Sequence, residues 1–174
     1  NLVRVLNFCV LAVLLAACGS TTGSSAPTIT LKANEVVSFS KDIAGGTENG
    51  WFPAENGGTW SQSDRAVLNL DYDKEWENGA NINLKMAAFV NAKNPEITVS
   101  ISVNEEPLQE VKFDVSKISD EVLVRISRET ISKYNGKMTL VFDISNAAIP
   151  KELGISSDER KLGIFLMEMV ANPE

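Results

Sequence analysis

A small set of aromatic and charged residues offers binding chemistry in this sequence. Trp51 and Trp60 lie in one Gly- and Asn-rich stretch, Glu55 lies between them, and Asp158 and Arg160 follow near the C-terminus. Indole rings stack on the C–H faces of sugar rings, and the planar guanidinium of arginine forms paired hydrogen bonds with carboxylate or phosphate groups. The pattern therefore predicts a ligand-binding surface made of Trp51, Glu55, Trp60, Asp158 and Arg160.

The same residues also have a structural interpretation. An aromatic side chain buries about 150–250 Å², so the tryptophans can instead pin a loop to the core, an interpretation that fits Trp60 best. Arg160 can pair with Glu55 or Asp158 and thereby tie two loops together. The sequence alone leaves both interpretations open.

Catalysis has little support in the sequence. The chain contains no histidine, which removes the commonest general base and the commonest metal ligand. The sequence contains no phosphate-binding loop of the Walker or Rossmann type, and no pair of carboxylates is marked out for glycoside hydrolysis. We therefore expect a protein that is not an enzyme.

An acidic stretch raises the question of a metal ion. Asp71, Asp73, Glu75 and Glu77 alternate along the chain, and clustered carboxylates bind Ca²⁺. The EF-hand pattern fails because the twelfth position, counted from Asp71, is Ile82. An extended chain would place all four carboxylates on one side. We interpret them as a solvated strand edge and expect no cofactor, with a structural Ca²⁺ as the alternative.

The N-terminus carries a different chemistry. Residues 8–17 are almost wholly apolar and follow Arg4, which is the layout of a secretory signal. The run is shorter than the ~20 residues that span a membrane. Residues 15–18, Leu-Ala-Ala-Cys, resemble the lipobox of bacterial lipoproteins. This resemblance implies that Cys18 carries a lipid anchor to the membrane. Gly19, in place of the Asp that retains lipoproteins at the inner membrane, favours the outer membrane of the cell envelope.

These features divide the chain into three parts. We predict a lipoprotein signal peptide over residues 1–17, a flexible tether over residues 18–27 and one folded domain over residues 28–174. Cleavage removes one basic residue and no acidic one, which changes the formal net charge from −7 to −8. So acidic a domain repels nucleic acid, and we exclude nucleic acid as a partner. The domain has no cysteine and therefore no disulfide.

Apolar residues recur with a period of two along the domain, which predicts strands. The clearest examples are residues 66–72, 82–86 and 138–144, together with residues 97–103 and 111–115, which we expect to form a hairpin. Many short strands with little helix predict an all-β fold. We expect an antiparallel β-sandwich of jelly-roll type, with an up-and-down barrel as the alternative.

Three segments depart from this alternation. Residues 41–63 have no clean period and are predicted to form a long loop, which in a compact domain is usually functional or mobile. Residues 127–134 are expected to form one or two helical turns. Residues 162–170 are nearly all apolar, a composition that suits a strand buried on both faces.

Two segments show a second resemblance. The first runs Gly-Trp-Phe-Pro-Ala-Glu over residues 50–55 and continues with Gly-Thr-Trp-Ser over residues 58–61. The second comprises residues 150–154 and residues 157–164. Together they resemble the β-sandwich accessory domain of phosphoglycerol transferases and of some membrane glycosyltransferases of envelope glycan synthesis. No catalytic domain accompanies the module in this sequence. The resemblance therefore implies a setting, the glycans of the envelope, more than a reaction.

Two functional hypotheses follow from these observations. In the first, the protein is an envelope lipoprotein that binds an envelope saccharide through the predicted surface. In the second, it is a structural or assembly lipoprotein that docks onto an envelope protein of glycan synthesis or export. Exposed tryptophans beside the charged residues would favour the first hypothesis. Buried tryptophans and an apolar patch elsewhere would favour the second.

Overall fold

The computed structural model describes residues 27–174. The predicted signal peptide, Cys18 and all but the last residue of the predicted tether lie outside the described residues. The helices of the described domain are η1 (Gly46–Asn49), η2 (Lys74–Trp76) and α1 (Arg128–Ile131). Its strands are β1 (Thr28–Thr30), β2 (Val36–Ser38), β3 (Thr59–Gln62), β4 (Arg65–Asp71), β5 (Gly79–Ala88), β6 (Glu96–Val103), β7 (Glu106–Asp114), β8 (Ser119–Ser127), β9 (Lys137–Ser145) and β10 (Leu162–Pro173).

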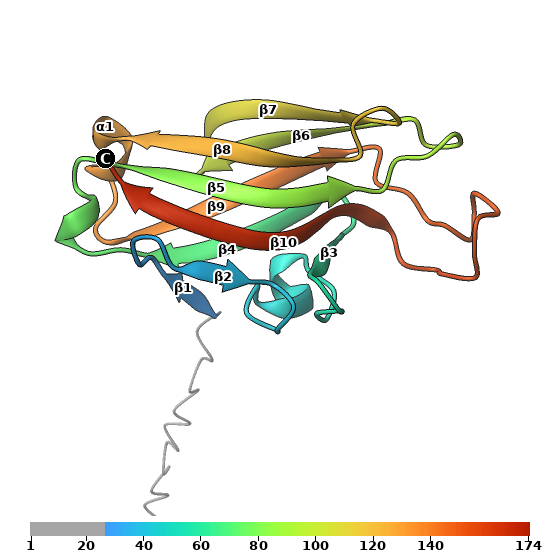
Figure 1. Cartoon of the computed structure of the whole chain (residues 1–174), viewed down its shortest axis with the longest axis horizontal. Coiled ribbons are helices and arrows are strands. Elements are labelled where there is room, and N and C mark those ends of the chain that lie inside the picture. The colour runs from blue at the N-terminus through green and yellow to red at the C-terminus, as the bar shows by residue number, and fades with distance from the viewer. Residues whose placement is uncertain (1–26) are drawn as a thin grey trace, which may run out of the picture.

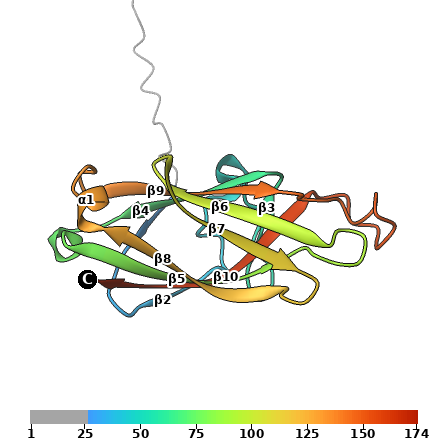
Figure 2. The same ribbon diagram turned by 90° about the horizontal axis from the view of Figure 1, so that it is seen from above.

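The strands form two sheets that pack face to face as two layers (Figure 2). One sheet has the order β1-β4-β9-β6-β7, and the other has the order β2-β10-β5-β8. Strand β3 pairs with β10 next to β2. The sets β4-β9-β6-β7 and β3-β10-β5-β8 have the strand order of a jelly roll. The predicted antiparallel, jelly-roll-like sandwich is confirmed. The short β1 is an exception because it pairs with β4 in parallel.

The alternation predicted from the sequence decides which side chains enter the core. In β6, Ile97, Val99, Ile101 and Val103 are at most 1% exposed. The intervening residues face outward, as period-two geometry requires. The predicted hairpin is the β6–β7 pair. Its turn places Asn104 and Glu105 at φ 43° and 70°, and this left-handed backbone matches the twist of the two strands.

Two predicted segments differ in detail from the structure. Residues 41–63 are not one continuous loop, because they contain η1 and β3. Strand β10 is only partly a doubly buried strand. Leu162, Gly163 and Ile164 are buried in succession, but Phe165 and several later residues are partly exposed. The difference arises because neighbouring strands cover the edges of β10 and leave the outer face of this ladder open.

The sandwich has two distinct ends (Figure 1). The helix α1, the helix η2 and the C-terminus lie at one end, and the loop between β9 and β10 projects at the other. The predicted helical turns over residues 127–134 are confirmed by α1, which begins after Ser127; the Ser127 hydroxyl accepts a hydrogen bond from the Thr130 backbone N–H at 3.2 Å. Among the helices within residues 27–174, not one has the length and apolar character needed to cross a bilayer.

Candidate functional site

Trp51 is a core residue in this structure. Its side chain is 0% exposed, its ring packs edge-on against Phe142 at 5.8 Å between centroids, and its indole N–H donates to the Val67 carbonyl at 2.8 Å. The backbone explains the direction of the side chain, because Trp51 pairs with the equally buried Ser61 and both face inward. The structure therefore corrects the prediction that Trp51 offers a stacking surface for a sugar.

Trp60 lies on the opposite face of the same pairing and is partly exposed. Its ring centroid lies 4.9 Å from that of Phe165 and 6.2 Å from that of Phe89. Phe52, whose backbone N–H donates to the Trp60 carbonyl at 2.9 Å, is also partly exposed. These four aromatic residues, which we call the outer aromatic strip, run along the outside of the β3–β10 ladder.

Glycine explains how the outer aromatic strip packs so closely on the backbone. A Cβ atom at Gly58 would lie 2.4 Å from the Leu166 carbonyl oxygen and 2.9 Å from Cε1 of Phe165. Only glycine leaves room for the Phe165 ring at this position. Gly50, just before the buried Trp51, has φ 78°, and a Cβ there would meet the Arg65 carbonyl oxygen at 2.2 Å. The two glycines allow one loop to send one tryptophan inward and the other outward.

Arg160 joins the two charged parts of the predicted surface. Its guanidinium donates to both carboxylate oxygens of Asp158, with Nη2 to Oδ2 at 2.8 Å, and also donates to Glu55. Its Cζ atom lies 5.2 Å from the centre of the Phe52 ring, a cation–π geometry. We call Glu55, Asp158 and Arg160 the Arg160 cluster. Each guanidinium nitrogen already has a carboxylate partner, so the cluster ties the loops together as the structural interpretation proposed.

The electrostatics of the Arg160 cluster follow from these contacts. Side-chain and backbone hydrogen bonds from Arg160 hold the pKa of Asp158 below its ordinary value. Hydrogen bonding to Asp158, and then to Glu55, raises the pKa of Arg160 despite its partial burial. The three side chains are between 27% and 42% exposed. Two carboxylates and one guanidinium give the cluster a formal charge of −1.

The two segments that carry the resemblance to the envelope accessory domain lie side by side. Besides the Arg160 cluster, the Ile164 backbone N–H donates to the Ser61 hydroxyl at 2.8 Å. Lys161 also pairs at 2.7 Å with Asp64, which lies just after the first segment. Motif residues about a hundred positions apart thus belong to one structural unit. The contacts agree with a common structural role for the two motifs, and the family relationship itself stays a prediction.

The acidic stretch does not follow one extended strand. Asp71 ends β4, whereas Asp73 caps the N-terminus of η2, and its carboxylate accepts from the Glu75 backbone N–H at 2.9 Å. The turn of η2 separates the carboxylates that the sequence placed on one side. Within residues 27–174, no group of three or more acidic, histidine or cysteine side chains is arranged to hold a metal ion. The described residues therefore offer no set of ligating side chains for the structural Ca²⁺ that the sequence raised as an alternative.

Sequence reasoning missed two members of the outer aromatic strip, Phe89 and Phe165. Phe165 lies within an apolar run that we interpreted as core, and Phe89 directly follows β5. The register that places Phe165 opposite Trp60 is a long-range pairing, and no local pattern indicates it.

Comparisons with known proteins concern the fold. No family model matches this chain, and no curated protein matches it in sequence. Among solved structures, the insecticidal delta-endotoxin Cry8Ea1 of Bacillus thuringiensis is similar, with a TM-score of 0.52 and 10% identity over 84% of this chain and 25% of the toxin. Module CsCBM6-3 of Clostridium stercorarium, in complex with cellobiose, has a TM-score of 0.42 and 12% identity over 84% of this chain and 98% of the module.

A carbohydrate-binding module CBM36, in complex with calcium and xylotriose, has a TM-score of 0.36 and 9% identity over 84% of this chain and 96% of the module. The chain spans about a quarter of the toxin's length. At these identities the likeness extends to the fold alone. The toxin match and the strand order together establish the domain as an all-β sandwich.

Proposed function

We propose that this protein is a lipoprotein of the cell envelope that is anchored through Cys18 to the outer membrane rather than to the inner membrane. We propose further that its jelly-roll domain binds an envelope saccharide without catalysis. The outer aromatic strip is the observation that carries the proposal. Jelly rolls serve as lectin domains, but a fold does not determine a function. The proposal therefore rests on the side chains of the strip and on the predicted lipid anchor.

The outer aromatic strip has the properties that a sugar-binding surface needs. Trp60 and Phe165 are held against each other at 4.9 Å, so their exposed parts are already ordered before a ligand arrives. Ordered aromatic groups lose little conformational entropy on binding. The small residues Ala87 and Ser119 continue the row of Phe165 across β5 and β8, so no large side chain follows Phe165 in this row.

The charges beside the strip define the class of saccharide. Glu55 and Asp158 outnumber Arg160, and Arg160 is already engaged with both. A strongly anionic glycan would meet excess negative charge here. We therefore propose a neutral saccharide. Both carboxylates accept hydrogen bonds from Arg160, and the chain contains no histidine. Both features agree with the proposed non-catalytic role.

Fluorine NMR of 5-fluorotryptophan-labelled protein tests the proposal at one residue. The chain has three tryptophans, and Trp51 and Trp76 are 0% exposed, so Trp60 alone reports on the surface. We expect a neutral oligosaccharide such as di-N-acetylchitobiose to shift the Trp60 resonance saturably and to leave the other two in place, and we expect delipidated lipopolysaccharide, which is anionic, to act more weakly.

A matched pair of variants completes the experiment. Phe165→Ala removes the ring beside Trp60 and should weaken binding about tenfold, whereas Leu123→Ala, an exposed apolar change on β8 of the same sheet, should not. A Trp60 resonance that no glycan moves would rule out saccharide binding by the strip. Equal affinities in the two variants would have the same consequence.

The alternative is a structural lipoprotein that docks onto an envelope protein of glycan synthesis or export. The observation that favours it is the turn between β7 and β8, where Val115 and Ile118 are 59% and 55% exposed. Exposed apolar groups close together often mark protein contacts. A photo-crosslinking amino acid at Ser116, between the two, should capture one reproducible envelope protein if this alternative holds. Capture that varies from one experiment to the next would argue against it.

A further inference from the structure

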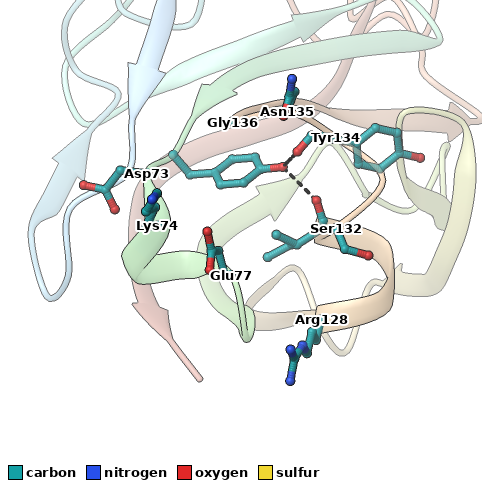
Figure 3. Close-up of a pocket in the computed structure, with 10 residues that line it drawn as sticks. Asp73, Lys74, Glu77, Arg128, Ser132, Tyr134, Asn135 and Gly136 are labelled. Carbon is teal, nitrogen blue, oxygen red and sulfur yellow. Dashed lines mark hydrogen bonds between the residues drawn. The ribbon is translucent and has the colours of Figure 1, made fainter.

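A separate pocket (Figure 3) is lined by residues at the α1 end of the sandwich. Figure 1 shows this end opposite the β9–β10 loop. Residues of segment 72–77 form one wall, and residues of segment 128–136 form the other. Its volume is about 460 Å³, within the range of small-molecule sites, which is roughly 300–1,000 Å³. We call it the α1-end pocket. The predicted binding surface does not include any residue of either wall.

The two walls of the α1-end pocket are fixed to each other by Tyr72. Its backbone N–H donates to the Gly136 carbonyl at 2.9 Å. Its hydroxyl lies 3.0 Å from the Ile131 carbonyl oxygen and also bonds to the carbonyl of Tyr134. The pocket is therefore preformed, and ligand binding would cost little conformational entropy for ordering its walls.

Burial at the base of each wall adds to this rigidity. Trp76 is 0% exposed and holds η2 to the core, and Ile131 at 2% exposure does the same for α1. Burial around the hydroxyl also raises the pKa of Tyr72. The phenol is thus neutral over the physiological range and acts as a structural donor.

Charged side chains of both signs line the α1-end pocket. Lys74 and Arg128 belong to its lining, and so do Asp73 and Glu77. In the part of the chain that the structure describes, these four side chains form no ion pair, whereas nine other basic residues do, for example Lys133 with Glu106 at 3.1 Å. Two positive and two negative side chains, all of them on exposed residues, therefore line one pocket without pairing with one another, and their formal charges sum to zero.

We propose that the α1-end pocket is a second ligand site, and that it takes a neutral, hydroxyl-rich ring such as one sugar unit. A hydroxyl group both donates and accepts hydrogen bonds. A carboxylate can accept a hydrogen bond from it, and a cationic side chain can donate one to its oxygen. Glu77 supplies the first and Arg128 the second, on opposite walls. A ligand with one strong charge would be repelled by half of the lining, whereas an uncharged polyol meets both signs favourably. The tyrosine rings offer surfaces for its C–H groups.

The two tyrosines of the chain give a direct readout of this site. Tyr72 and Tyr134 are the only tyrosines, and both line the α1-end pocket. Full-length protein labelled with 3-fluorotyrosine therefore has two fluorine resonances, both from this site. We would titrate it with methyl glucoside and N-acetylglucosamine, which are neutral, and with glucuronate and glucosamine, which carry one negative and one positive charge. The proposal expects saturable shifts with at least one neutral sugar and weaker effects of the two charged sugars.

Matched substitutions separate the site from its surroundings. Glu77→Gln and Arg128→Gln should each weaken binding about tenfold, as expected for a hydrogen bond to a charged group. Glu75→Gln and Arg125→Gln make the same chemical changes on neighbouring exposed residues that do not line the pocket, and should leave the affinity unchanged. Two dispersed fluorine resonances in each free variant show that it is folded.

The results decide the proposal without reference to the outer aromatic strip. Resonances that stay in place with both neutral sugars would overturn it, and so would a response confined to glucuronate or to glucosamine. Equal losses in Glu77→Gln and Glu75→Gln would also overturn it. Trp60→Ala should leave the tyrosine shifts intact, so the failure of one site does not imply the failure of the other.

Discussion

The two ends of this sandwich use charged residues in opposite ways. Near the β9–β10 loop, Arg160 is shared between Asp158 and Glu55, and the adjacent Lys151 and Lys161 are paired as well. At the α1 end, the charged side chains that line the pocket form no ion pair within the described residues. Side chains that already neutralise one another have little left for a ligand, whereas unpaired ones in a preformed pocket can bind one.

The sequence suggested that the tryptophan-containing motif binds a ligand and that the acidic stretch does not, and the structure suggests a different assignment. The conspicuous motif, with its tryptophans and its Arg and Asp residues, is largely a device that joins β3 to β10. The acidic stretch forms one wall of the α1-end pocket, because η2 changes the direction of the chain there. Exposure, and not residue type, distinguishes the outer aromatic strip from the buried Trp51 within the same motif. Variants that separate the structural from the exposed residues are therefore the most direct test of the comparison.

The largest expected effect separates Trp51 from Trp60. Trp51→Ala removes a fully buried indole and should lower the free energy of unfolding by about 3–5 kcal/mol. Trp60→Ala removes a partly exposed ring and should cost about 1 kcal/mol. Urea denaturation followed by circular dichroism measures both, since the signal does not depend on the tryptophan removed.

A milder variant keeps the test valid if Trp51→Ala does not fold. Trp51→Phe retains most of the ring and leaves the Val67 carbonyl without its donor, at a cost of about 1–3 kcal/mol. Trp76→Phe is its control, because the indole N–H of Trp76 is buried without a partner among the described residues and its removal forfeits no hydrogen bond. Equal losses for Trp51→Phe and Trp76→Phe would contradict the role assigned to Trp51.

The fold was largely predictable, for a physical reason. Strand alternation is a local property, and in a sandwich each strand shows one face to the core, so residues such as Val99 and Ile101 reveal their side from their neighbours alone. The β6–β7 hairpin followed from adjacent strands and a short turn. The parallel pairing of β1 and the open outer face of β10 were not predicted, because both depend on partners far away in the sequence.

The candidate site was less predictable for the same reason. Trp51 and Trp60 look equivalent in the sequence, and only the pairing of Trp51 with Ser61 decides that one faces inward. The ion pair between Glu55 and Arg160 was foreseen as one of two interpretations. The α1-end pocket was not foreseen, because the Tyr72 hydroxyl meets the Tyr134 carbonyl across 62 positions. No spacing rule connects residues that only the fold brings together.

Arg160 gives the next largest effect and tests the structural side of the comparison. Arg160→Ala leaves Asp158 and Glu55 side by side without their cation, and it should lower the free energy of unfolding by about 1 kcal/mol, since the group is partly exposed. Arg125→Ala, at an exposed arginine with no ion pair in the described part of the chain, should change it by less than about 0.5 kcal/mol. Guanidinium chloride would screen the charges, so urea is the denaturant of choice.

The effect of Arg160→Ala also depends on pH in a defined direction. The pKa of Asp158 is lowered in the folded state, so its contribution to stability is present above the ordinary aspartate pKa and is lost as the pH falls through the folded-state value. The difference between wild type and Arg160→Ala should therefore shrink as the pH falls below about 4. A difference that stays constant from neutral pH into acid would show that packing on Phe52, and not the ion pair, holds the loops.

The smallest effect is expected at the other end, from Tyr72. Its pKa is raised by burial, so the unfolded chain ionises at a lower pH than the folded protein, and the unfolded state binds fewer protons above about pH 10. The free energy of unfolding should therefore decline from about pH 9 to about pH 11. Tyr72→Phe has no phenol to ionise and should show a shallower decline, whereas Tyr134→Phe should keep the contribution of Tyr72.

Urea denaturation at successive pH values measures these slopes, and ultraviolet absorbance follows the phenolate directly. A steeper slope for wild type than for Tyr72→Phe would mean that the Tyr72 hydroxyl is enclosed by the carbonyl groups of segment 128–136, as a preformed pocket requires. Parallel slopes would mean that segments 72–77 and 128–136 separate readily in solution. The α1-end pocket would then have to form on binding. The contrast between the paired charges of the Arg160 cluster and a preformed pocket at the α1 end would no longer hold.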